Sequence, residues 1–113
     1  MTDERKYIRY EVDQAVGVIT LDRPQKANAQ NERFLDELDA CFDLAAADRA
    51  VRVIVLRAEG KHFSAGHDLV VDDEAPKLAN DDGTWWESEL YDWEHRKYLG
   101  FGLKWRNIPK PTI

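Results

Sequence analysis

The chain has 113 residues, with 16 Lys and Arg against 22 Asp and Glu and a formal net charge of −6. This length allows one domain at most, and the acidic balance argues against a broad nucleic-acid surface, which needs a basic face. No apolar run approaches the ~20 residues of a membrane span, and no hydrophobic signal core follows the N-terminus. We therefore expect a cytoplasmic protein with no membrane or nucleic-acid partner. The single cysteine, Cys41, excludes an internal disulfide.

The first segments predict a β-hairpin. Ile8, Tyr10 and Val12 alternate with charged residues, which is typical of a half-buried strand. Residues 15–21 are rich in β-branched side chains and predict a second, antiparallel strand. Pro24 ends that strand because it cannot donate to a strand ladder.

A helix and a third strand are expected next. Apolar residues recur at helical spacing over residues 31–47, and either Asn28 or Asn31 is suited to cap the start of this helix. Cys41 falls on the apolar stripe and is expected in the core. Residues 51–57 hold an uninterrupted apolar run, which favours a strand parallel to its predecessor and covered on both faces.

The second half of the chain predicts a mobile loop and then a long helix. Residues 71–83 are polar and acidic, and their carboxylates show no metal-ligand spacing, so no metal site is expected. The capping box formed by Thr84 and Glu87 predicts a helix that ends by Asn107. Two glycines inside it each cost roughly 1 kcal/mol and would allow a kink or break.

The turn that follows the third strand has the most distinctive chemistry. Ala65 and Gly66 are small, so the backbone can adopt dihedrals closed to other residues and a ligand can approach it closely. Amides after such a turn can point at a developing negative charge. Ser64 is not in a G-x-S-x-G motif, and His62 and His67 lack zinc-ligand spacing, so neither a serine nucleophile nor a metal is expected.

Two cations lie in the loop over residues 22–29. Arg23 and Lys26 are most simply explained as solvated charges. The functional alternative is contact with a ligand phosphate, which ammonium and guanidinium groups commonly bind.

Several segments together resemble the enoyl-CoA hydratase/isomerase family, the crotonase superfamily. The resemblance runs from about residue 8 to the last residue, in family order, through residues 16–24, 26–29, 51–56, 63–69 and 108–113. It implies an α/β fold, the N-terminal part of a crotonase-like ββα spiral, in which an antiparallel hairpin is followed by helix–strand units. Residues 1–113 would then be part of one domain whose C-terminal part is absent, and residues 108–113 would lead into a next core strand.

The resemblance also implies a site. The backbone N–H of His67 would stabilise an enolate in an oxyanion hole, while its imidazole, where the family often has alanine, adds bulk and a titratable group near the reacting carbons. Residues implied in binding coenzyme A are Arg23, Gln25, Lys26, Ala27, Ala65, Gly66, Asp68 and Leu69. Of these, Ala65 would accept a hydrogen bond from the adenine amine at its backbone carbonyl.

The implied activity is a lyase that adds water to a 2-enoyl-CoA thioester. The alternatives are an enoyl-CoA isomerase, another crotonase-type acyl-CoA enzyme, or a non-catalytic acyl-CoA-binding or scaffolding protein. Coenzyme A is part of the substrate, so no separate cofactor is implied, and a homotrimer or hexamer is the family norm. The acid and base are expected beyond Ile113, so the 113-residue chain alone is expected to be inactive.

Overall fold

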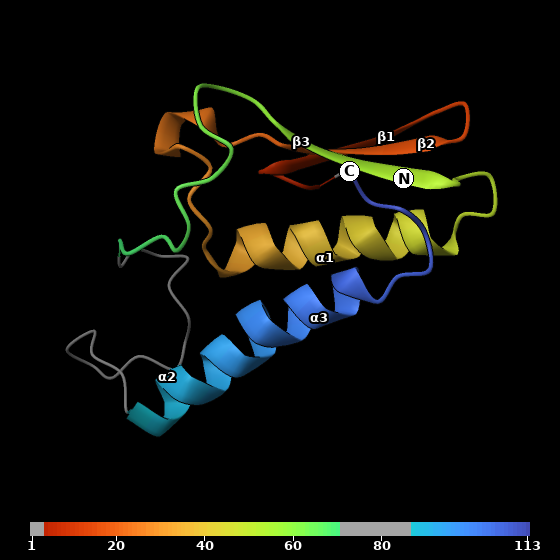
Figure 1. The fold of residues 1–113 in the computed structure, drawn as a ribbon. Helices are drawn as coiled ribbons and strands as arrows, with labels where there is room; N and C mark the ends of the chain where they lie inside the picture. Colours follow the sequence, from red (N-terminus) through yellow and green to blue (C-terminus); the bar gives the residue numbers. More distant parts are fainter. Residues whose placement is uncertain (1–3, 71–86) are drawn as a thin grey trace.

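The computed structural model describes residues 4–70 and 87–113, which form a layered arrangement of one sheet and two helical segments (Figure 1). One helix lies against a face of the sheet, and the second helical segment packs on the far side of that helix. The predicted mobile loop over residues 71–83 and the capping residue Thr84 lie outside the described residues. None of the described helices combines the length and apolar character needed to cross a membrane.

The sheet has three strands in the order β1-β2-β3. Strands β1 (Ile8–Asp13) and β2 (Val16–Leu21) form the predicted antiparallel hairpin, and β3 (Val53–Ala58) pairs parallel with β2, as predicted. The predicted start of β3 at residue 51 is wrong by two positions, because the N–H groups of Arg52 and Val53 both donate to the carbonyl of Ala15 before the ladder begins.

Helix α1 (Glu32–Ala47) supplies most of the core. Asn31 caps it, since its side chain accepts a hydrogen bond from the backbone N–H of Phe34 at 2.9 Å, which decides between the two candidate caps. Its buried face packs on the sheet, and the fully buried residues include Phe34, Cys41, Ala45, Ile19 and Ile54. Among the described residues, helices cover only this face of the sheet, so the expected two-sided cover of β3 is wrong here.

The second helical segment runs without a break from residue 87 to 106. It consists of α2 (Glu87–Glu94), the π-helical stretch η2 (His95–Gly100) and α3 (Phe101–Arg106). The two glycines therefore accompany a change of hydrogen-bonding pattern rather than a break, and the predicted end of the helix by Asn107 is confirmed. Trp105 stacks on Phe42 of α1 with ring centroids 4.9 Å apart, which attaches α3 to the core helix.

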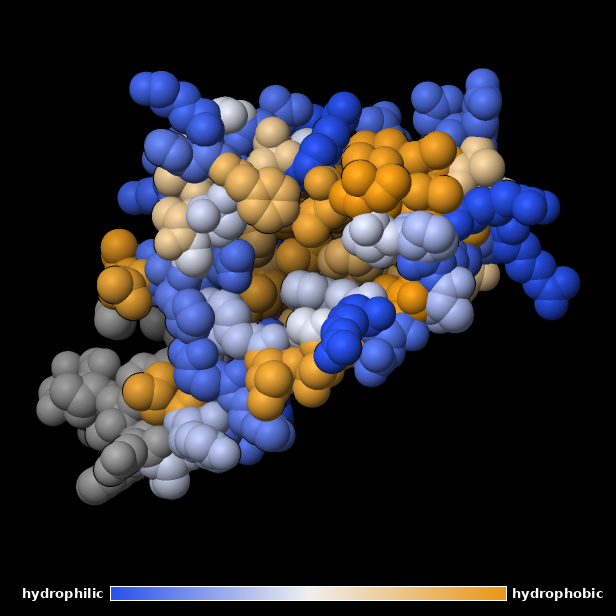
Figure 2. All heavy atoms as spheres, viewed as in Figure 1, coloured by the Kyte–Doolittle hydropathy of each residue, from blue (hydrophilic) through white to orange (hydrophobic). Residues whose placement is uncertain are grey.

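The last residues lie along the outer edge of β3. Ile54 N–H donates to Pro111 O at 2.9 Å, and Ile113 N–H donates to Ile54 O at 2.9 Å, so Thr112 pairs parallel with Ile54. This pairing agrees with the expectation that residues 108–113 lead into a next strand. Hydrophobic side chains gather over this edge on the face shown in Figure 2.

Candidate functional site

The site is built from two loops that hydrogen bonds hold side by side. Ala65 N–H donates to Ala27 O at 2.9 Å, Gln30 N–H donates to Gly66 O at 2.7 Å, and Asp68 N–H donates to Gln30 O at 2.9 Å. The loop after β2 and the turn after β3 are thus joined by backbone pairing. The structure therefore brings together the two groups of residues predicted to bind coenzyme A.

A buried polar network supports this junction. Asn28 is fully buried, and its Oδ1 accepts from Arg23 N–H at 2.8 Å. Its Nδ2 donates to the carbonyls of Glu59 and His62 at 2.9 and 3.0 Å. Ser64 Oγ donates to Asn28 O at 2.8 Å and accepts from the N–H of Gly66 at 3.1 Å. Sequence reasoning missed these roles, because the bonds from Asn28 to Glu59 and His62 and from Ser64 to Asn28 join positions 31 to 36 residues apart.

Arg23 has a structural role that its sequence position did not reveal. The residue is 4% exposed, and Nη1 lies 2.7 Å from Asp68 Oδ2 and 2.8 Å from Ala29 O. The guanidinium also sits over the ring of Tyr7, 4.7 Å from its centroid. Arg23 therefore ties the two loops together, and its contact with a ligand phosphate stays a prediction.

The electrostatics of this pair favour the charged form of Asp68. Burial by itself would raise the pKa of Asp68, but the hydrogen bond from Val70 N–H and the Arg23 guanidinium outweigh it and lower that pKa.

By contrast, Gln25 and Lys26 are exposed on the short 3₁₀ helix η1 (Pro24–Lys26), where a ligand can reach them.

The turn itself has the geometry that its small residues suggested. Gly66 has φ +88°, a left-handed conformation that other residues rarely adopt, although no atom would obstruct a side chain there. Residues 66 and 68 supply the ladder contacts to Gln30. In the trans peptide between residues 66 and 67 the N–H points opposite to the C=O, and Gly66 O faces Gln30, so the N–H of His67 points away from Gln30. Within the part of the chain that the structure describes, that N–H donates to no carbonyl.

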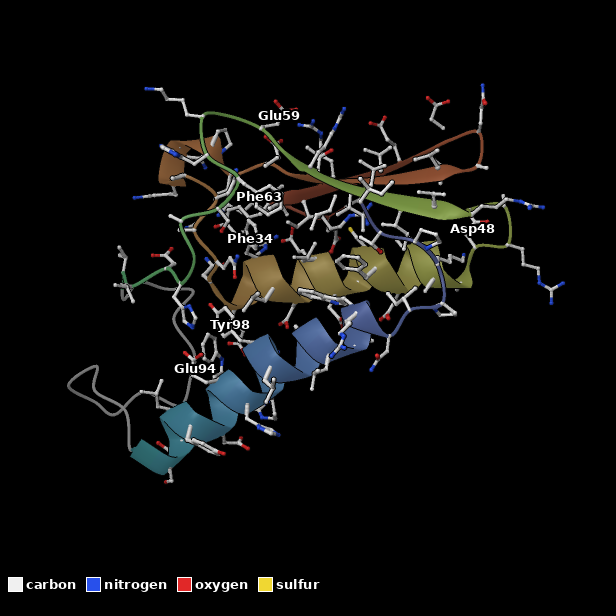
Figure 3. All side chains as sticks on the ribbon, in the orientation of Figure 1. Phe34, Asp48, Glu59, Phe63, Glu94 and Tyr98 are labelled. Atoms are coloured by element: carbon white, nitrogen blue, oxygen red, sulfur yellow. The ribbon has the colours of Figure 1, made fainter. Side chains whose placement is uncertain are left out.

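The imidazole of His67 contacts the distant helical segment. Its Nε2 lies 2.8 Å from both carboxylate oxygens of Glu94, and its ring stacks on Tyr98 with centroids 3.7 Å apart. In Figure 3, Glu94 and Tyr98 lie on the part of the helical segment that faces the loops. Sequence reasoning missed this contact, because His67 and Glu94 are 27 positions apart. Across residues 4–70 and 87–113, no three His, Cys, Asp or Glu side chains come together as metal ligands.

The comparisons with known proteins place the chain in a family. A sequence model of the enoyl-CoA hydratase/isomerase family matches residues 11–98. The chain therefore belongs to the enoyl-CoA hydratase/isomerase family, and the predicted crotonase-type α/β fold is confirmed by its structural neighbours.

Named relatives include both hydratases and isomerases. A candidate enoyl-CoA hydratase of Mycobacterium tuberculosis, EchA13, is 41% identical over 97% of this chain and 39% of its own length. A trans-2-decenoyl-[acyl-carrier-protein] isomerase of Streptococcus mutans is 33% identical over 96% of this chain and 38% of its own length. The structure of a probable enoyl-CoA hydratase from Mycobacterium smegmatis matches with 48% identity and a TM-score of 0.78, over 94% of this chain and 38% of that one. The chain spans about two fifths of the length of these relatives.

Proposed function

We propose that the protein acts on 2-enoyl-CoA thioesters and that its reaction is the addition of water to the double bond. The observation that carries the proposal is the turn over residues 65–68, where Gly66 at φ +88° leaves the N–H of His67 directed away from the ladder. Family membership supplies the substrate class. A backbone N–H donor at this place is suited to stabilise negative charge on a thioester oxygen.

In the proposed reaction, the oxygen of water bonds to C3 of the acyl group and a proton bonds to C2. Between these events the electron pair of the double bond moves toward the thioester oxygen, which becomes an enolate oxygen. The N–H of His67 is our candidate donor to that oxygen. Each such donor is typically worth about 3–4 kcal/mol of the barrier.

The nucleotide end of coenzyme A is proposed to bind across the two joined loops. Exposed Gln25 and Lys26 lie in one loop, and Ala65 and Leu69 lie in the other. Lys26 supplies a positive charge for a phosphate, and the carbonyl of Ala65 supplies an acceptor for the adenine amine. A cytoplasmic location and a homotrimeric or hexameric assembly belong to the same proposal and rest on the family resemblance.

Isomerisation of the double bond is the second candidate function. It is favoured by relatives named as isomerases, including the Streptococcus mutans protein and a dienoyl-CoA isomerase of Mus musculus that is 33% identical over 84% of this chain. Both reactions need charge stabilisation at the thioester oxygen. They differ in whether water enters the product.

A substrate assay combined with mass spectrometry tests the proposal. Purified protein of measured intact mass is incubated with but-2-enoyl-CoA and, separately, with hex-3-enoyl-CoA. A product heavier by one water supports the hydratase, and a rearranged product of unchanged mass supports the isomerase. Calorimetric binding without turnover supports the acyl-CoA-binding alternative. Absence of acyl-CoA binding by folded protein would contradict all three functions: hydratase, isomerase and acyl-CoA-binding protein.

A further inference from the structure

His67, Glu94 and Tyr98 form a compact cluster between the turn and the helical segment. The His67 ring is nearly parallel to the Tyr98 ring, with an interplanar angle of 13°. Trp93 is 6% exposed and meets both rings edge-on, at centroid distances of 6.5 Å from His67 and 5.2 Å from Tyr98. The imidazole is therefore held from the side of the helical segment, while its side chain remains 44% exposed.

A second contact fixes the helical segment to the same turn. Tyr98 OH donates to Gln30 O at 3.0 Å, and Gln30 itself pairs with the residues on both sides of His67. Burial, aided by the negative charges of Glu94 and Asp68, raises the pKa of Tyr98, so the phenol keeps its proton as a donor. Tyr98 lies in the π-helical stretch, and such stretches often mark functional positions.

The contact with Glu94 determines which imidazole nitrogen carries the proton. An ionised carboxylate only accepts hydrogen bonds, so Nε2 must be the donor. In the neutral ring the other nitrogen, Nδ1, then holds the free electron pair. A carboxylate hydrogen-bonded to a histidine nitrogen in this way fixes the orientation of the ring.

We propose that the His67 imidazole is a catalytic base for proton transfer at the acyl Cα, with Glu94 as its positioning residue. The inference rests on the proposed function, in which the N–H of the same residue binds the thioester oxygen. The amide and the ring belong to one residue whose side chain is 44% exposed, and in the proposed step the acyl carbons of a thioester bound at the amide lie alongside that ring. Both groups needed for the step lie within the described residues.

The step balances without another reactant. Nδ1 takes a proton from Cα, the C–H electron pair forms the enolate double bond, and the carbonyl electron pair moves onto the thioester oxygen at the N–H of His67. The imidazolium then returns a proton to Cα. Of the described residues, the ionisable groups around the ring are Glu94 from α2, Tyr98 from η2 and Asp68 from the same turn, and Asp68 is engaged by Arg23.

Exchange of the Cα protons of butanoyl-CoA in D₂O tests the proposal, because this saturated thioester cannot be hydrated. The wild-type chain should replace Cα hydrogen with deuterium, in contrast to the inactivity that the family resemblance implied for the 113-residue chain, because the proposed base lies within it. His67→Gln keeps the amide and removes the base, so exchange should fall by about 100-fold or more. Glu94→Gln keeps the size of the side chain without its charge, and should lower exchange by a smaller factor. His95→Ala, which removes a histidine from the same helical segment, is the matched control and should exchange like wild type.

Two further measurements separate catalysis from packing. Calorimetry should show that His67→Gln still binds butanoyl-CoA, and ¹⁵N NMR should show the Nε2–H tautomer of His67 in wild type but not in Glu94→Ala. Binding of butanoyl-CoA by the wild-type chain without exchange, or exchange that His67→Gln leaves unchanged, would overturn the inference and leave the proposed function standing. Failure of the folded wild-type chain to bind butanoyl-CoA would contradict both.

Discussion

The sheet with α1 and the helical segment over residues 87–106 are stabilised in different ways. The sheet and α1 bury large apolar side chains completely, among them Phe34, Ile19 and Ile54. Among the described residues of the helical segment, Trp93 is the one large apolar side chain that is buried. Charged pairs also attach this segment, because Lys97 lies 2.6 Å from Asp36, and Lys104 reaches two carboxylates on α1.

This difference predicts which of the two parts unfolds locally at the lower free energy. A fully buried apolar side chain contributes about 1.5–3 kcal/mol, whereas an exposed ion pair contributes roughly 0–1 kcal/mol. We therefore expect the helical segment to detach at a lower free energy than the sheet and α1 unfold. Glu94 and Tyr98 lie on the more weakly attached segment and His67 lies in the turn after β3, so Glu94 can position the proposed base only when the segment is docked.

The largest effect is expected from the core. Phe34→Ala should lower the free energy of unfolding by roughly 3–5 kcal/mol, because Phe34 is fully buried and its removal leaves a cavity. Urea denaturation followed by circular dichroism measures this. Leu103→Ala, at a 45% exposed position of α3, should change the same quantity by less than about 0.5 kcal/mol. Equal losses in the two variants would remove the contrast between the regions.

Next comes the buried ion pair beneath the candidate site. Arg23→Met leaves the Asp68 carboxylate buried without its partner and should cost about 3 kcal/mol of unfolding free energy. The double variant Arg23→Met/Asp68→Leu should recover most of that loss, since no unpaired charge remains. A full thermodynamic cycle by urea denaturation is the measurement. A double variant no more stable than Arg23→Met would show that the pair is not coupled.

Acid should weaken the same pair. The folded state lowers the pKa of Asp68, so its contribution to stability is complete above the pKa of unfolded Asp, about 3.9, and is lost as the pH falls through the folded value. Wild-type protein should therefore lose stability below about pH 4 more steeply than Asp68→Asn does. Unfolding free energies measured between neutral and acid pH compare the two. Parallel curves would refute the assignment.

The smallest effect is expected at the attachment of α3. Lys104 lies 3.0 Å from Asp39 and 2.9 Å from Asp43, with its side chain 45% exposed. Lys104→Ala should cost at most about 1 kcal/mol, seen as faster amide hydrogen exchange in α3. The difference should vanish at about 1 M salt, where the Debye length is about 3 Å.

A control for that variant lies on the same helical segment. Arg96→Ala removes a pair with Asp92 that does not bridge to α1, so it should leave hydrogen exchange in α3 unchanged. A salt-independent effect of Lys104→Ala, or an equal effect of Arg96→Ala, would argue against attachment by charge.

The sequence alone was sufficient for the features that depend on near neighbours. The alternation in residues 8–12, the helical spacing after Asn31 and the small residues of the turn at Ala65 and Gly66 each report a local backbone preference. Such preferences act over a few residues, and so the hairpin, α1 and the turn could be predicted. The resemblance of these segments to the enoyl-CoA hydratase/isomerase family then predicted the overall fold and a candidate site.

Only the tertiary structure decided how the polar groups of the site are used. Arg23 and Asp68 are 45 positions apart, and His67 and Glu94 are 27 apart. No periodic pattern links such positions, because a polar side chain can be buried wherever the fold supplies a partner. For that reason Arg23 and Lys26, three residues apart in one loop, have opposite environments, one buried in an ion pair and the other exposed to solvent.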